Sequence, residues 1–112
     1  MSEQDLKLTE FRRAWMDADG HYVDDIRDAN GDGSLIQAIE YNWWRHQANW
    51  SMAATAALEK TNPTIATLLQ SATDLNNKIK DGREKAEHIV KIVGKSAKIA
   101  EALGKLLKAV AQ

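Results

Sequence analysis

Apolar residues recur at alternating steps of three and four along most of the chain, a heptad spacing that is typical of one face of an α-helix. The longest run extends from Ile65 to Val110, and almost every stop on it is apolar or small. Further apolar positions beside this run, such as Leu69, Val90 and Ile99, widen the stripe. A stripe of this width predicts a helix that faces several neighbours rather than a single coiled-coil partner.

The same spacing predicts two helices in the first half of the chain. One runs from near the N-terminus to about residue 28, and Gly20 is a place where it can break, because glycine inside a helix costs about 1 kcal/mol against alanine. Another follows the NGDG segment, with Ser34 as a candidate N-cap. Asn62 followed by Pro63 is typical of an N-cap and a first helical position, so a third helix is expected to begin there.

The second half of the chain contains one ambiguous joint, the KDGRE segment at 80–84. Asp81–Gly82 is a common turn, but the apolar spacing passes through it without losing phase. If the chain turns at Gly82, the protein is an all-α, up-and-down bundle of four helices. If it does not, there are three helices, and the last is about 72 Å long and needs another chain to cover its apolar stripe. We expect the turn, since short connections are usual in bundles.

The composition fits one soluble domain and removes several kinds of chemistry. With 112 residues, a single helical-bundle domain over 1–112 is expected. Cysteine is absent, so the chain has no disulfide, no thiolate nucleophile and no cysteine-ligated zinc site. No apolar run is long enough to cross a bilayer, and the cytoplasm is the default compartment.

Charge is distributed unevenly, although the net charge is only −1. Residues 1–40 hold ten acidic and four basic side chains, whereas residues 78–112 hold nine basic and four acidic ones. Such a split predicts either that the two ends pair within the molecule or that the basic end meets an acidic partner. We favour internal pairing, because opposite ends of small bundles often lie side by side.

The segment between the first two predicted helices resembles part of an EF-hand calcium loop. Asp28, Asn30 and Asp32 fit its first three ligand positions. The bidentate glutamate is missing, because Ile39 stands where it is required and Glu40 follows one residue too late. Asn, Asp and Gly also tolerate the left-handed backbone of an interhelical turn, which is the interpretation that we favour. A calcium ion at Asp28, Asn30 and Asp32 is the alternative, and no other cofactor is expected.

Four tryptophans are many for a chain of this length. Helical spacing places Trp15, Trp43 and Trp50 on apolar stripes, so we expect them in the core. His46 lies on the same helical face as Trp43 and Trp50, which predicts a layer of tryptophan and histidine.

Trp44 lies about 100° around the helix from its neighbour Trp43 and so leaves the apolar stripe. With Tyr41 and Arg45 it forms the best candidate for a protein-recognition surface, because tryptophan, tyrosine and arginine are enriched in binding hot spots.

The last segment of the chain predicts a basic amphipathic helix. Its lysines opposite the apolar stripe are Lys91, Lys95, Lys98, Lys105 and Lys108. Such a helix can lie on an anionic membrane, or the lysines can be the solvated side of a bundle helix. Ser96, Ala100 and Gly104 form a row of small residues at four-residue spacing, which permits close approach of another helix and favours packing over lipid binding.

Catalytic patterns are weak in this sequence. His21, His46 and His88 are widely separated and match neither the HExxH pair nor the Glu-x-x-His repeats of di-iron bundles. The basic residues do not interleave with aromatic ones, so nucleic acid is not favoured as a partner.

We therefore expect a non-enzymatic protein–protein interaction module that self-associates as a homo-oligomer or binds a partner helix. One alternative is a membrane-active or secreted protein that uses its basic C-terminal helix. Another is a calcium-responsive bundle that uses the loop at Asp28–Ser34.

Overall fold

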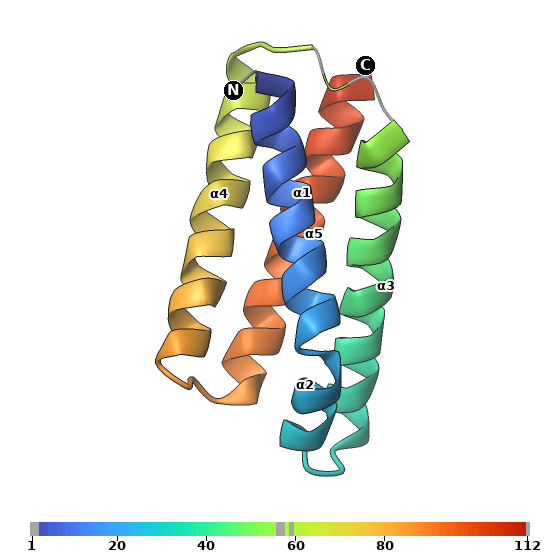
Figure 1. Ribbon diagram of the computed structural model, residues 1–112, viewed down its shortest axis with the longest axis vertical. Helices are drawn as coiled ribbons and strands as arrows, with labels where there is room; N and C mark the ends of the chain where they lie inside the picture. The colour runs from blue at the N-terminus through green and yellow to red at the C-terminus, as the bar shows by residue number, and fades with distance from the viewer. Residues whose placement is uncertain (1–2, 56–57, 59, 112) are drawn as a thin grey trace.

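The computed structural model describes residues 3–55, 58 and 60–111, which form helices and their connections without any strand. The helices are α1 (Glu3–Gly20), α2 (Tyr22–Asp28), α3 (Gly33–Thr55), α4 (Pro63–Glu84) and α5 (Ile89–Ala111). The prediction of an all-α helical bundle is confirmed. In Figure 1, α1 and α2 run downward in line, α3 runs upward, α4 downward and α5 upward.

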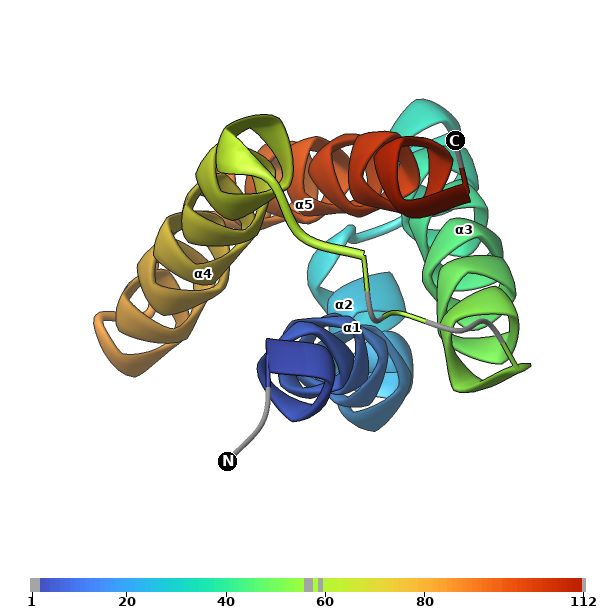
Figure 2. The same ribbon diagram turned by 90° about the horizontal axis from the view of Figure 1, so that it is seen from above.

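The two helices α3 and α4 occupy opposite sides of the bundle, as the view from above shows (Figure 2). Both pack against α5 and against α1. The described residues of the connection from α3 to α4, which are 58 and 60–62, lie at the top of the bundle (Figure 1). Lys7 of α1, which is fully buried, donates hydrogen bonds to the carbonyl oxygens of Leu58 and Lys60 at 3.0 and 2.9 Å and so ties this connection to α1.

The first predicted helix is divided at His21, directly after Gly20, so the break that we considered near this glycine is present. The division is slight. The backbone N–H of His21 still donates to the carbonyl of Asp17 at 3.1 Å, and that of Asp25 donates to the carbonyl of His21 at 2.8 Å.

The helix starts follow from N-cap chemistry. The side-chain oxygen of Asn62 accepts the N–H of Ile65 at 2.9 Å, and Pro63 is the first residue of α4, as predicted. The prediction of Ser34 as the cap of α3 is wrong. α3 begins at Gly33, and the carboxylate of Asp32 accepts the N–H of Leu35 at 3.1 Å, because aspartate at this position reaches the free N–H groups of the first turn.

The chain turns between α4 and α5, which excludes the single long C-terminal helix. The in-line helices α1 and α2 together take the place of the first of the four predicted helices. The turn lies at 85–88, however, and Gly82 is buried inside α4. The N–H of Glu87 donates to the carbonyl of Gly82 at 2.9 Å, and that of Ala86 donates to Arg83 at 3.1 Å. This is a Schellman motif with Ala86 in the left-handed region, at φ 53°.

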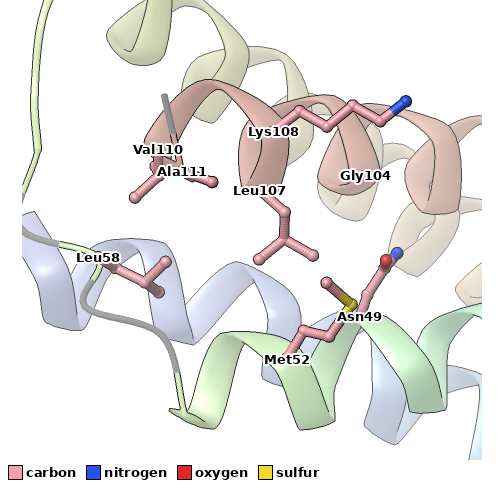
Figure 3. A pocket seen from close by; sticks show the side chains of 8 residues that line it. All are labelled: Asn49, Met52, Leu58, Gly104, Leu107, Lys108, Val110 and Ala111. Atoms are coloured by element: carbon pink, nitrogen blue, oxygen red, sulfur yellow. The ribbon is translucent and has the colours of Figure 1, made fainter.

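One hydrophobic core lies between the helices, and α5 supplies the largest share of it. Its fully buried members include Phe11 of α1, Ile65 of α4, and Leu103 and Leu106 of α5. None of the helices in the described part of the chain is both long and apolar enough to span a membrane. A pocket of about 580 Å³ opens between α3 and α5 where both helices end (Figure 3).

Candidate functional site

Three polar side chains of α3 point into its interface with α5 and bond to the backbone of that helix. We call these residues, Asn42, His46 and Asn49, the polar ladder. Their acceptors are, in the same order and each at 3.1 Å, the carbonyl oxygens of Val93, Ser96 and Ala100. A helical carbonyl has a second lone pair, so it can accept such a bond in addition to its own helical one. The polar ladder thereby fixes the rotation of α3 about its axis.

The aromatic residues Tyr41 and Trp44 lie on the opposite side of α3. Trp44 is roughly 160° around the helix from His46, so the rotation that buries His46 exposes Trp44. Tyr41 and Trp44 are each 62% exposed. The guanidinium carbon of Arg45 lies 5.2 Å from the centre of the Tyr41 ring, within the range of a cation–π contact. We call Tyr41, Trp44 and Arg45 the aromatic surface.

Trp43 supports the aromatic surface from the side of α1 and α2. Its ring centre lies 4.9 Å from that of Trp44 in an edge-to-face arrangement, 5.3 Å from Trp15 and 5.8 Å from Tyr22. Its indole N–H donates to the carboxylate of Asp19 at 3.0 Å. These contacts join α3 to α1 and α2, so Trp44 packs against a neighbour that is itself fixed.

The predicted core tryptophans, Trp15, Trp43 and Trp50, are half-buried rather than central. The indole N–H of Trp43 donates to Asp19 rather than to His46. His46 is fully buried, but its hydrogen bonds run to Ser96 of α5. Indole rings are large and carry a polar N–H, which is why tryptophan is seldom completely buried.

His46 is held as a neutral imidazole. Its Nε2 faces the carbonyl oxygen of Ser96, and since a carbonyl only accepts, Nε2 carries the hydrogen. Its Nδ1 is buried and has no hydrogen-bond partner among the residues that the structure describes. Protonation there would place a charged, unpaired N–H in the core. Burial accordingly lowers the pKa of His46 from 6.5 to about 4, although the hydrogen bond to Ser96 acts in the opposite direction.

The predicted partner site at Ser96, Ala100 and Gly104 needs correction. Ser96 and Ala100 are only 7% and 1% exposed, because α3 of the same chain lies over them. Their small size permits this close approach. Gly104 is partly exposed and borders the pocket at the end of the bundle.

The candidate calcium segment, which contains Asp28, Asn30 and Asp32, turns the chain between α2 and α3. Asn30 and Gly31 have positive φ values of 51° and 81°, as the turn interpretation predicts. The carboxylate of Asp32 is engaged as the cap of α3. Among the residues that the structure describes, no three or more histidine, aspartate or glutamate side chains are grouped to hold a metal ion.

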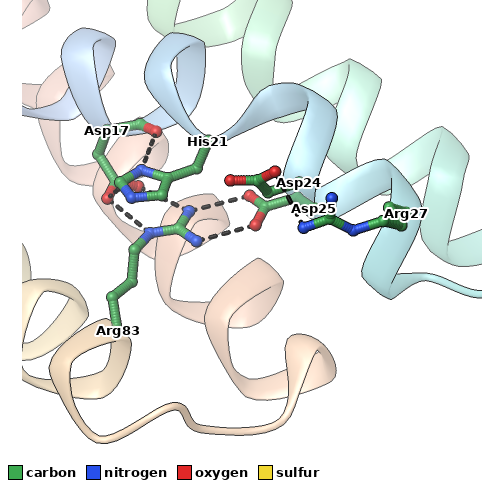
Figure 4. A network of polar contacts seen from close by, with 6 residues as sticks. All are labelled: Asp17, His21, Asp24, Asp25, Arg27 and Arg83. Carbon is green, nitrogen blue, oxygen red and sulfur yellow. Dashed lines mark hydrogen bonds and ion pairs between the residues drawn. The ribbon is translucent and has the colours of Figure 1, made fainter.

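Arg83 of α4 joins α1 and α2 through two carboxylates (Figure 4). It donates to Asp17 from Nε and Nη2 at 2.7 and 3.0 Å, and to Asp25 from Nη1 and Nη2 at 2.8 and 2.9 Å. Burial alone would lower the pKa of Arg83, but hydrogen bonds to Asp25 and Asp17 raise it above its ordinary value. For Arg83, the predicted pairing of the acidic and basic ends is confirmed.

Comparison with known proteins does not indicate a function for these surfaces. No family model matches the chain, and no curated protein or solved structure is significantly similar to it. Function has to be inferred from the geometry of the molecule.

Proposed function

We propose that this protein is a non-enzymatic interaction module that self-associates through the aromatic surface of α3. The observation that supports this most directly is the exposure of Tyr41 and Trp44, at 62% each. Large aromatic side chains that face water gain much by burial against a partner, and tryptophan, tyrosine and arginine are enriched in binding hot spots. All three residue types stand together here.

The charges near the aromatic surface favour a second copy as the partner. Glu40 is exposed next to Tyr41, and Arg45 lies over the Tyr41 ring. One negative and one positive charge thus flank Trp44, and two copies can approach without the repulsion that like-charged faces impose. Most homo-oligomers pair the same patch of both copies about a two-fold axis.

Sedimentation equilibrium of the full chain tests the proposal. The wild type is expected to dimerise, and Trp44→Ala is expected to raise the Kd about thirtyfold, since loss of a hot-spot side chain weakens binding by about 2 kcal/mol. Val23→Ala is the matched control, because Val23 on α2 is 74% exposed and lies outside the aromatic surface. A wild type that stays monomeric, or equal Kd values for the wild type and Trp44→Ala, would contradict the proposal.

Membrane binding through α5 has less support. Its lysines face outward, but its apolar side is packed in the core, so this side is not free to enter a lipid surface while the bundle is closed. Co-sedimentation with anionic vesicles separates this alternative from self-association.

A calcium response also has less support than self-association. The carboxylate of Asp32 already caps α3, and a bound ion would have to compete with that hydrogen bond. Tryptophan fluorescence during a calcium titration tests this alternative.

A further inference from the structure

The pocket between the ends of α3 and α5 has the size and lining of a small-molecule site. Its volume of about 580 Å³ lies within the range of about 300–1,000 Å³ that is usual for ligand pockets. Met52 of α3 and Leu107 of α5 point toward each other across it, and Leu58 lies at one end (Figure 3). None of these residues belongs to the aromatic surface.

The walls of the pocket are apolar and leave room for an added group. Met52 is 57% exposed, so much of its surface is available to a ligand. Methionine is a flexible apolar side chain that adapts to irregular ligands. A Cβ added to Gly104, which also lines the pocket, would meet no atom of the described residues within 4 Å. An aliphatic chain in this space would cover Met52 and the exposed edges of the surrounding side chains.

One cation stands at the rim of the pocket. Lys108 runs along α5 beside Gly104 with its Nζ pointing away from Met52 and Leu107 (Figure 3). It has no ion-pair partner in the part of the chain that the structure describes, so this exposed side chain is free to turn toward a ligand at the opening. Among the described lining residues, Asn49 is the other polar one, and one of its two amide hydrogens is already donated to the carbonyl oxygen of Ala100. The ends of α3 and α5 carry partial negative charge, so an anion here depends on Lys108.

We propose that this pocket binds a single-chain amphiphile with an aliphatic tail of medium length and a carboxylate head group. The tail lies between Met52 and Leu107, and the carboxylate accepts a hydrogen bond from the Nζ of Lys108. This site is independent of self-association through the aromatic surface, because the two use different residues.

Binding of decanoate to protein labelled with ¹³C in its methionine methyl groups tests the site. The Met52 resonance is expected to shift and saturate, whereas that of Met16, on α1 and outside the pocket, is expected to stay in place. Octanoate should bind more weakly than decanoate, since each additional buried methylene lowers the Kd about fourfold. No shift of Met52, or equal shifts of both methionines, would overturn the proposal.

Two glycines of α5 provide a matched pair of variants. Gly104→Leu fills the pocket and is expected to abolish decanoate binding. Gly94→Leu makes the same change on α5 at an exposed position outside the pocket and should bind like the wild type. In the part of the chain that the structure describes, no atom lies within 4 Å of a Cβ added there. Decanoate that still binds Gly104→Leu at wild-type affinity would show that it lies elsewhere.

The head group is tested with decanol and with Lys108→Gln. Decanoate is expected to bind the wild type more tightly than decanol, and Lys108→Gln should weaken decanoate about tenfold and leave decanol unchanged. Equal binding of decanol and decanoate to the wild type would overturn the assignment of a carboxylate ligand.

Discussion

The imidazole Nε2 of His46 on α3 lies 3.0 Å from the hydroxyl oxygen of Ser96 on α5, in the core of the bundle. This contact has a consequence for stability at low pH. The folded pKa of about 4 is below the ordinary value of 6.5, so between these values the unfolded chain binds a proton that the folded chain excludes. The contribution of His46 to stability is complete above pH 6.5 and decreases as the pH falls toward 4.

His46→Gln should remove this part of the pH dependence, because the amide of glutamine can still donate to Ser96 but does not titrate. As the pH falls from 6.5 to 4, the free energy of unfolding of the wild type is expected to decrease by about 3 kcal/mol relative to that of the variant. Urea unfolding at a series of pH values measures this difference. His88→Gln is the control, since His88 is exposed. A pH dependence in His46→Gln equal to that of the wild type would show that His46 titrates normally.

Arg83→Gln should destabilise the fold by about 3 kcal/mol, because it leaves Asp17 and Asp25 close together and largely buried without a counter-charge. Arg27→Gln should change the free energy of unfolding by less than about 1 kcal/mol, since its pair with Asp24 is exposed. Urea denaturation of both variants compares them directly. Similar effects at the two arginines would mean that the buried network contributes no more than a surface pair.

Ala86→Gly should stabilise the protein by about 1 kcal/mol. Ala86 has a φ of 53° at the end of α4, where glycine avoids the steric cost of the left-handed region. Ala97→Gly, in the middle of α5, should destabilise by a similar amount. Thermal unfolding of the two variants gives the sign of each effect, and loss of stability in Ala86→Gly would exclude the left-handed conformation of this residue.

Gly94→Ala and Gly82→Ala should differ, although both exchange glycine for alanine inside a helix. Gly94→Ala is expected to raise stability by about 1 kcal/mol. Gly82→Ala is expected to give no gain, because its methyl group would overlap Oε1 of Glu87, whose carboxylate is held in place by an ion pair with Lys95. An equal gain in both variants, measured by urea unfolding, would show that Glu87 does not pack on Gly82.

The sequence is sufficient for the elements that depend on local chemistry. Helical periodicity and the Asn62–Pro63 signal are both local, and both predictions are confirmed. The place of the α4–α5 turn is not predictable in this way. Ala86 takes the left-handed conformation that sequence patterns assign to glycine or asparagine, so the apparent turn signal at Gly82 points a few residues too early.

The candidate site is predictable only in part. The outward position of Trp44 follows from its angle on the helix relative to the apolar stripe. The contacts of the polar ladder do not follow from the sequence in this way. Asn42 bonds to a backbone carbonyl 51 residues away, and every helical residue offers such a carbonyl whatever its side chain. Charge asymmetry predicted that the two ends would pair, but it could not single out Arg83 among nine basic residues.

Fluorine NMR of protein labelled with 5-fluorotryptophan tests the role of the aromatic surface most directly. Each tryptophan gives its own resonance, so the four sites can be followed separately as the protein concentration is raised. We predict that the Trp44 resonance shifts with concentration, while that of Trp15, half-buried between α1 and α3, does not. A Trp44 resonance that stays constant over the whole concentration range would contradict self-association through this surface.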